Sequence, residues 1–243
     1  IFLWARLAFT CLPTCRVRNY MYLLHIAIVA AAYVTVCAGS YLMIRGAGAV
    51  SLGQGALLGI GSYAIAIGCV TFGQPYWVSL LAGVAIAGLI SLVLAHFSIR
   101  LQGDYLVIST LAFQLALHEI ALNFAALTNG PMGIANVPRP ELFGFSFEHD
   151  MHMLIFASVC AGLALALTCA LNRSPFGLVL AAVREQPSLA MAAGYSVHRT
   201  KVQVCAIGGI FAGLGGALLA GSTRFVDPSS LALGESLLIL SII

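Results

Sequence analysis

One acid and one histidine stand together inside an apolar run. Glu119 follows His118 about two-thirds of the way along the stretch 105–127. An ionisable side chain inside a membrane is costly unless it faces water or a partner. Two roles fit this placement: an ionisable group on a transport pathway, or a helix-to-helix hydrogen bond by a protonated or paired carboxylate. The residues alone leave both roles open.

A second group of side chains carries the chemistry of metal ligands: Glu148, His149, Asp150 and His152. It lies where a polar loop meets an apolar run, which favours a hydrated patch at a membrane interface over a metal site. The sequence contains no GxxxxGK[ST] phosphate loop, no HExxH and no GxSxG. We therefore expect no catalytic residue, no metal and no cofactor, and any ATP hydrolysis is expected in separate subunits.

The elements that would position these groups are membrane helices. The 54 residues from Gly46 to Ile99 contain no Asp, Glu, Lys or Arg. Such a stretch lacks the polar face of a soluble helix and is long enough for two crossings and a turn. Charged residues form 8% of the chain and hydrophobic residues 61%, which excludes a disordered chain. The composition predicts an all-α, polytopic transmembrane helical bundle, and the net charge of +3 gives no reason to expect nucleic acid as a partner.

Charge-poor windows place the individual spans. They cover residues 19–44, 51–71, 76–97, 105–127, 151–172 and 202–223, and another begins near Ser236. Residues 2–14 are interpreted as the remnant of an earlier helix. The chain begins at Ile1 and stops inside an apolar run, so we expect residues 1–243 to be one transmembrane domain of a longer protein, truncated at both ends. The glycines of 46–55 indicate either close helix packing or a broken helix that lines a cavity.

Two polar segments predict the orientation. Residues 128–150 carry mainly acids, whereas 173–201 carries four basic residues against one acid. The positive-inside rule places 173–201 in the cytoplasm. Within this loop we expect a helix over 178–184, a break at Gln186 and Pro187, and a second short helix that Ser188 caps and Gly194 ends. A short helix projecting into the cytoplasm suits docking to a partner protein, and an amphipathic loop lying on anionic lipid is the alternative.

Five segments together resemble a known family. They are GAGAVSLGQG (46–55) with GIGSY (59–63), GDYLVISTLAF (103–113), TNGPMGI (128–134), SPFG (174–177) with AVRE (182–185) and AG (193–194), and FVDP (225–228) with ES (235–236). In this order they resemble the permease subunits of branched-chain amino acid ABC importers, of the LivM type.

The resemblance implies a multi-pass permease in a bacterial inner membrane. Its partners would be membrane lipid, a second permease, two cytoplasmic ATPase subunits and an extracytoplasmic substrate-binding protein. The implied substrates are branched-chain or hydrophobic amino acids, with urea or short-chain amides as the alternative. A different class, an ion-coupled secondary transporter, would use Glu119 with His118 as its relay.

The resemblance also assigns residues. The segment 184–194 matches the part of the family that docks on the ATPases, so coupling is expected at Arg184, Glu185, Ala192, Ala193 and Gly194. The substrate path is expected to contain small residues and hydroxyls, namely Ser51, Ser62, Ser109 and Thr110, and to include Glu119. The chain departs from the family pattern at Pro187 and Met191, where the family often carries an acid.

Overall fold

The computed structural model describes residues 2–46, 48, 50–98, 104–142, 145–146 and 150–243. Within that part, six helices are long and apolar enough to cross a membrane. They are α1 (Phe2–Tyr41), α2 (Gln54–Ala66) with its π-helical extension Ile67–Thr71, α3 (Tyr76–Ser98), α4 (Asp104–Asn123), α6 (Asp150–Arg173) and α9 (Val197–Thr223). The predicted all-helical membrane bundle is confirmed.

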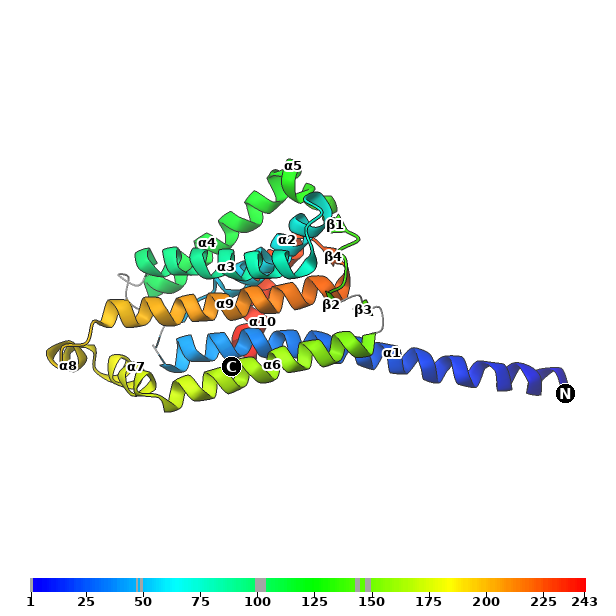
Figure 1. Cartoon of the computed structure of the whole chain (residues 1–243), viewed down its shortest axis with the longest axis horizontal. Coiled ribbons are helices and arrows are strands. Elements are labelled where there is room, and N and C mark those ends of the chain that lie inside the picture. Colours follow the sequence, from blue (N-terminus) through cyan, green and yellow to red (C-terminus); the bar gives the residue numbers. More distant parts are fainter. Residues whose placement is uncertain (1, 47, 49, 99–103, 143–144, 147–149) are drawn as a thin grey trace.

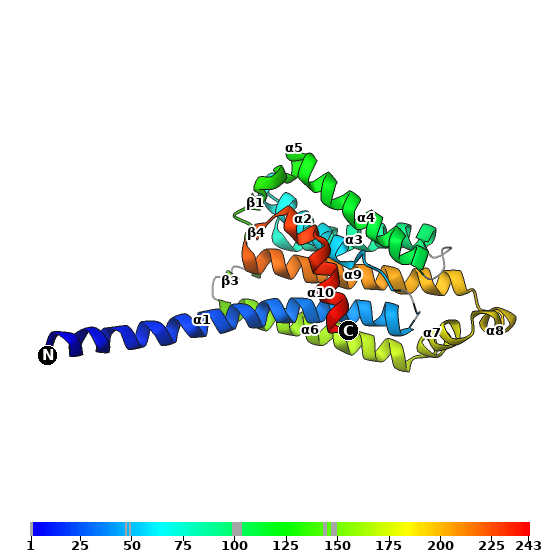
Figure 2. The same cartoon turned by 180° about the vertical axis from the view of Figure 1, so that it is seen from behind.

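Helix α9 forms the centre of this bundle. In its most apolar stretch of 18 residues, 72% of the residues are buried, whereas the corresponding share in α4 is only 17%. Figure 1 shows α9 between the group α2, α3 and α4 on one side and the pair α1 and α6 on the other. The short helix α10 (Leu233–Ile242) crosses the bundle and contacts α1, α2 and α4, as the rear view in Figure 2 shows. A central helix buried on nearly all sides needs small side chains at its contacts.

Glycines supply those contacts between α2 and α9. A Cβ atom added at Gly216 would lie 1.9 Å from the backbone oxygen of Leu58, and one added at Gly61 would lie 2.2 Å from that of Gly213. Small residues allow helix backbones to approach this closely in lipid. Close packing is therefore one correct interpretation of the glycine-rich helices.

The first helix differs from the expectation at its N-terminal end. Residues 2–14 do not form a separate helix, because α1 is continuous from Phe2 to Tyr41 and a π-helical turn Leu42–Gly46 extends it. The physical reason is local, since no glycine or turn-forming pair separates Thr14 from Asn19.

The helix is interrupted between Gly46 and Gln54. Gly48 has a φ angle of 64°, a left-handed conformation that glycine adopts without a steric penalty. Of the two interpretations left open for this segment, the structure therefore agrees with the broken helix. Helix α4 also ends earlier than expected, at Asn123, and the chain turns at Phe124 into the short helix α5 (Ala125–Thr128).

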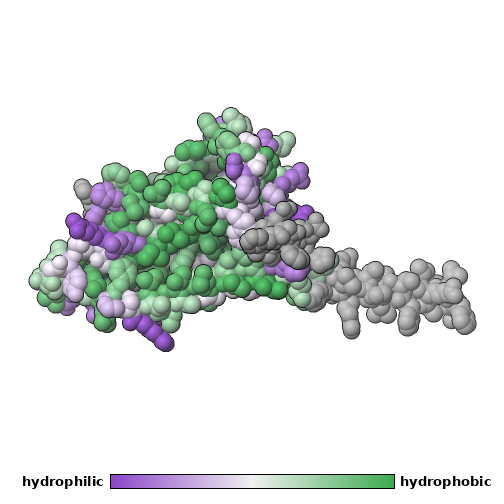
Figure 3. Space-filling model, viewed as in Figure 1, coloured by the Kyte–Doolittle hydropathy of each residue, from purple (hydrophilic) through white to green (hydrophobic). Residues whose placement is uncertain are grey.

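The polar segments lie at opposite ends of the bundle (Figure 1). At one end β1 (Ile134–Ala135) pairs antiparallel with β4 (Phe225–Val226), with Ile134 opposite Val226, and β2 (Glu141–Leu142) pairs with β3 (Phe145–Ser146). At the other end lie α7 (Pro175–Glu185) and α8 (Pro187–Ala192). Figure 3 shows hydrophobic residues covering the flank between these ends. The two polar segments thus fall where a membrane protein meets water.

Candidate functional site

The N-terminal end of α2 lies inside the bundle, where its backbone N–H groups need partners. The first N–H groups of a helix have no acceptor within that helix. Here the N–H of Gly55 donates to Ser236 Oγ at 2.8 Å, and the N–H of Ala56 donates to Gln114 Oε1 at 3.3 Å. Side chains of α10 and α4 therefore cap α2 from outside its own sequence.

Gln114 is the centre of this network and is fully buried. Its Nε2 donates to the backbone oxygens of Leu231 and Ala232 at 3.1 and 2.9 Å, and its Oε1 accepts the Ser236 hydroxyl at 2.6 Å. One side chain thus ties α4 to α2, to the turn at 228–231 and to α10. Sequence reasoning missed Gln114, and the available signal was a glutamine inside a charge-poor span.

Two predicted path residues meet beside this capped helix end. Ser51 and Thr110 line one small cavity with Gln54, between the ends of the broken helix and α3, α4 and α9. The Thr110 hydroxyl accepts the N–H of Leu52 at 3.1 Å, so it also holds the interrupted backbone in place. Gln54 is the second residue that sequence reasoning missed.

The other two predicted hydroxyls lie elsewhere. Ser109 forms a hydrogen bond with Ser98 at 3.0 Å, and these two serines line a pocket between α3 and α4 whose other lining residues are apolar. Ser62 donates to the backbone oxygen of Gly216 at 2.8 Å and lines a cavity of about 270 Å³ near β4. Asp227 and Glu235 also line that cavity, and the Tyr33 hydroxyl donates to Glu235. The structure therefore separates the four hydroxyls into three places.

Glu119 and His118 point to different surroundings. Glu119 is exposed on α4, and the Asn123 amide donates to its Oε2 at 3.3 Å and to its backbone oxygen at 2.9 Å. The His118 ring lies 3.0 Å from the backbone oxygen of Pro228. Glu119 lines none of the cavities described above. Its hydrogen-bond partner, Asn123, lies one turn further along its own helix.

We expect the substitution Glu119→Gln to have little effect. The amide keeps the size of the side chain and the contact with Asn123, and exposed substitutions typically change the free energy of unfolding by less than about 0.5 kcal/mol. Thermal unfolding and substrate uptake of the assembled transporter measure this. A large loss of uptake with unchanged stability would support the predicted place of Glu119 on the transport pathway.

The group Glu148, His149, Asp150 and His152, interpreted as a hydrated interfacial patch, is only partly described. Glu148 and His149 lie outside the described residues. Asp150 forms an ion pair with Arg139 at 2.5 Å, which engages its carboxylate. Among the described residues, no group of three or more metal-ligating side chains comes together.

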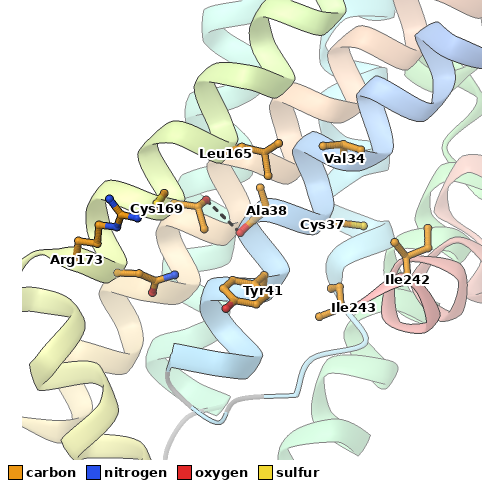
Figure 4. Close-up of a pocket in the computed structure, with 11 residues that line it drawn as sticks. Val34, Cys37, Ala38, Tyr41, Leu165, Cys169, Arg173, Ile242 and Ile243 are labelled. Carbon is orange, nitrogen blue, oxygen red and sulfur yellow. Dashed lines mark hydrogen bonds between the residues drawn. The ribbon is translucent and has the colours of Figure 1, made fainter.

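A further pocket of about 490 Å³ lies between α1, α6 and the end of α10 (Figure 4). Val34, Leu165 and Ile242 make its apolar wall, and Arg173 marks the end nearest α7. No predicted path residue lines it. The hydrogen bond from Thr168 Oγ1 to the Ala38 oxygen, 3.4 Å long, joins its two long helices.

The α7–α8 segment follows the expected pattern with one correction. The break falls at Gln186, as predicted. Pro187 is the first residue of α8, a position where the N–H that proline lacks would have no partner within the helix. Ser188 therefore lies inside the helix and does not cap it. Gly194 ends it with a φ angle of 87°. The N–H groups of Gly194 and Tyr195 donate to the oxygens of Met191 and Ala190 at 3.0 Å, the pattern of a Schellman motif.

One face of the segment is attached to the bundle. Leu180 and Val183 are buried, and the Arg184 guanidinium donates to the backbone oxygen of Arg45 at 2.9 Å. Arg184 thus turns back toward the end of the first span, whereas Glu185, Ala192, Ala193 and Gly194 are exposed. Large apolar side chains are exposed on the same segment at Leu178, Leu189, Met191 and Tyr195.

A bundle that confines its polar groups to helix ends and small internal cavities is typical of a multi-pass membrane transport protein. The family comparison agrees with this class. The chain belongs to the family described as branched-chain amino acid transport system / permease component, which matches residues 22–243. The predicted family and the placement in an inner membrane as a multi-pass protein are confirmed by this match and by the six apolar helices.

Curated relatives are similar over most of the chain. It is 29% identical over 234 residues to the high-affinity branched-chain amino acid transport system permease protein LivM of Escherichia coli (strain K12), covering 87% of this chain and 55% of the relative. It is 30% identical over 195 residues to the guanosine ABC transporter permease protein NupQ of Bacillus subtilis (strain 168), covering 74% of this chain and 60% of the relative. The chain thus spans little more than half the length of these relatives, and no solved structure matches it significantly.

Proposed function

We propose that this chain is the transmembrane permease subunit of an ATP-driven importer for branched-chain or other hydrophobic amino acids. The observation that carries the proposal is the exposed α7–α8 segment, in a chain whose family is the permease component of such systems. Two cytoplasmic ATPase subunits would dock on this segment. A second permease and an extracytoplasmic binding protein would complete the importer.

The charge distribution supports this orientation. Arg173, Arg184, Arg199 and Lys201 gather at the α7–α8 end of the chain, and basic residues favour the cytoplasmic side. The opposite end, with β1 and β4, would then receive the substrate from the binding protein. The coupling loop 173–201 would be the cytoplasmic part of the single transmembrane domain.

We place the substrate path along the broken helix. Ser51 and Thr110 converge there with Gln54, and the cavity between them is too small for an amino acid, as a closed path requires. Ser62 would belong to the wider cavity toward β4. Ser109 and Glu119 remain predictions for the path, and each lies outside both cavities.

Two alternatives concern the substrate class, and one concerns the transport mechanism. NupQ is named for guanosine, so related permeases differ in what they carry. Urea or short-chain amides remain the alternative from the sequence, and an ion-coupled transporter would need Glu119 as a relay. Purifying the chain with its native partners and measuring which of these solutes stimulates ATP turnover separates the classes, because ion-driven uptake without an ATPase would contradict the importer.

Substituting Leu189→Asp is expected to weaken the docking of the ATPase subunits. Leu189 is exposed on α8, and a charge at the centre of an apolar contact typically costs at least about tenfold in affinity. Met132→Asp is the control, since Met132 is an exposed large apolar residue at the opposite end of the bundle. Retention of the ATPases during purification measures the effect, and equal losses from both variants would contradict docking at α8.

A further inference from the structure

Gln54 is a buried side chain with only part of its hydrogen bonding satisfied. It is 3% exposed, and its Nε2 donates to the Met43 sulfur at 2.8 Å. Its carbonyl oxygen Oε1 has no hydrogen-bond partner among the described residues. A thioether sulfur only accepts hydrogen bonds, so the amide is assigned with its nitrogen toward Met43 and its carbonyl oxygen away from it. An unpaired carbonyl in this setting indicates a missing donor.

The cavity beside Gln54 has room for one such donor. Its volume is about 20 Å³. A water molecule needs roughly 10–15 Å³ of such space and two to four polar partners. The lining combines apolar and hydroxyl side chains and consists of Met43, Ser51, Gln54, Leu57, Ser91, Leu94, Ala95, Ser98, Leu106, Thr110 and Cys205.

Neighbouring hydroxyls do not supply the donor. The Ser91 hydroxyl donates to the backbone oxygen of Cys205 at 2.6 Å, and the Thr110 hydroxyl donates to that of Val107 at 3.0 Å. Ser51 Oγ accepts the N–H of Gly53 at 3.2 Å, and its own hydrogen has no acceptor among the described residues. A bound molecule that donates to Gln54 could therefore accept from Ser51.

We propose that the side-chain carbonyl of Gln54 binds one N–H or O–H donor in this cavity. In the conformation described here the donor is a water molecule. In the open path it is the N–H group of a passing substrate, a part of the proposal that rests on the proposed function. No charged side chain lines the cavity, so a bare metal cation would be uncompensated there, whereas the ammonium group of an amino acid carries its own carboxylate as counter-charge.

A high-resolution electron cryo-microscopy map of the complete wild-type complex without substrate tests the water site. We expect a density peak within hydrogen-bonding distance of Gln54 Oε1 and Ser51 Oγ. A map that resolves other buried waters but shows none in this cavity would overturn the site. This readout needs no transport activity, so it stands even if the proposed substrate is wrong.

The variant Gln54→Met distinguishes the two donors. Methionine has a similar length and no carbonyl, and Gln203→Met on an exposed face of α9 is the matched control. If substrate N–H groups use Gln54, the KM for uptake rises about tenfold, the value of one hydrogen bond, while thermal stability falls little. If Gln54→Met loses the water peak but keeps the wild-type KM, the site binds water only. That result would overturn the proposed contact with substrate and leave the proposed water site in place. A wild-type complex with no amino acid uptake would instead contradict the proposed function.

Discussion

Replacing Gly216 with alanine is expected to separate α2 from α9. The added Cβ would lie 1.9 Å from the Leu58 backbone oxygen and 3.1 Å from the Ser62 nitrogen. Backbone atoms cannot rotate away, so the helices must move apart and the Ser62 hydroxyl loses its bond to the Gly216 oxygen. Overpacking of this kind costs about 2–3 kcal/mol in the free energy of unfolding. Denaturant titration of the purified protein in mixed micelles measures the loss.

Gly162 on α6 provides the control for this prediction. An alanine Cβ there meets no atom within 4 Å. Gly162→Ala is therefore expected to leave stability unchanged or to raise it by up to about 1 kcal/mol, because alanine is the better helix former. If both variants unfolded at the same denaturant concentration as the wild type, the close contact between α2 and α9 would be wrong.

Replacing Gln114 with leucine is expected to damage the capped end of α2. Leucine has a similar size but removes four hydrogen bonds, which join Gln114 to Ala56, Leu231, Ala232 and Ser236. Each buried group left unpaired costs about 1–3 kcal/mol, and partial rearrangement keeps the total near 3 kcal/mol. The same micelle titration measures this loss.

Gln203→Leu is the matched control for Gln114, since Gln203 is an exposed glutamine within a span. It should leave the free energy of unfolding within about 0.5 kcal/mol of the wild type. The network would be of no energetic consequence if Gln114→Leu proved as mild as this control. Transport by Gln114→Leu should fall together with the amount of folded protein.

The spans were predictable because hydropathy is a local property. A stretch without charge from Gly46 to Ile99 predicts membrane helices regardless of what packs against them, and the structure agrees. Local signals also located the α7–α8 break and Gly194. The role given to Ser188 was wrong because Pro187 is itself a favourable first residue, which moves the cap of α8 from Ser188 to Gln186, two residues toward the N-terminus.

The capping and cavity residues were not predictable in the same way. Gln114 contacts Ala56, 58 positions away in the sequence, and Ser236, 122 positions away. No local periodicity reports such distant partners. The hydroxyls Ser51 and Ser62 look equivalent in sequence, yet Ser51, in the chain just before α2, lines the cavity at Gln54, whereas Ser62, within α2, donates to Gly216. Burial and direction decide their roles, and both depend on the packed helices.

The hydrogen bond from Arg184 to the Arg45 carbonyl has a genetic consequence. Every amino acid presents the same backbone oxygen at position 45, so no substitution there deletes the acceptor. The donor, in contrast, exists only as long as position 184 encodes a side chain that reaches it. Substitutions of Arg184 should therefore remove this hydrogen bond, whereas substitutions of the Arg45 side chain should leave it in place.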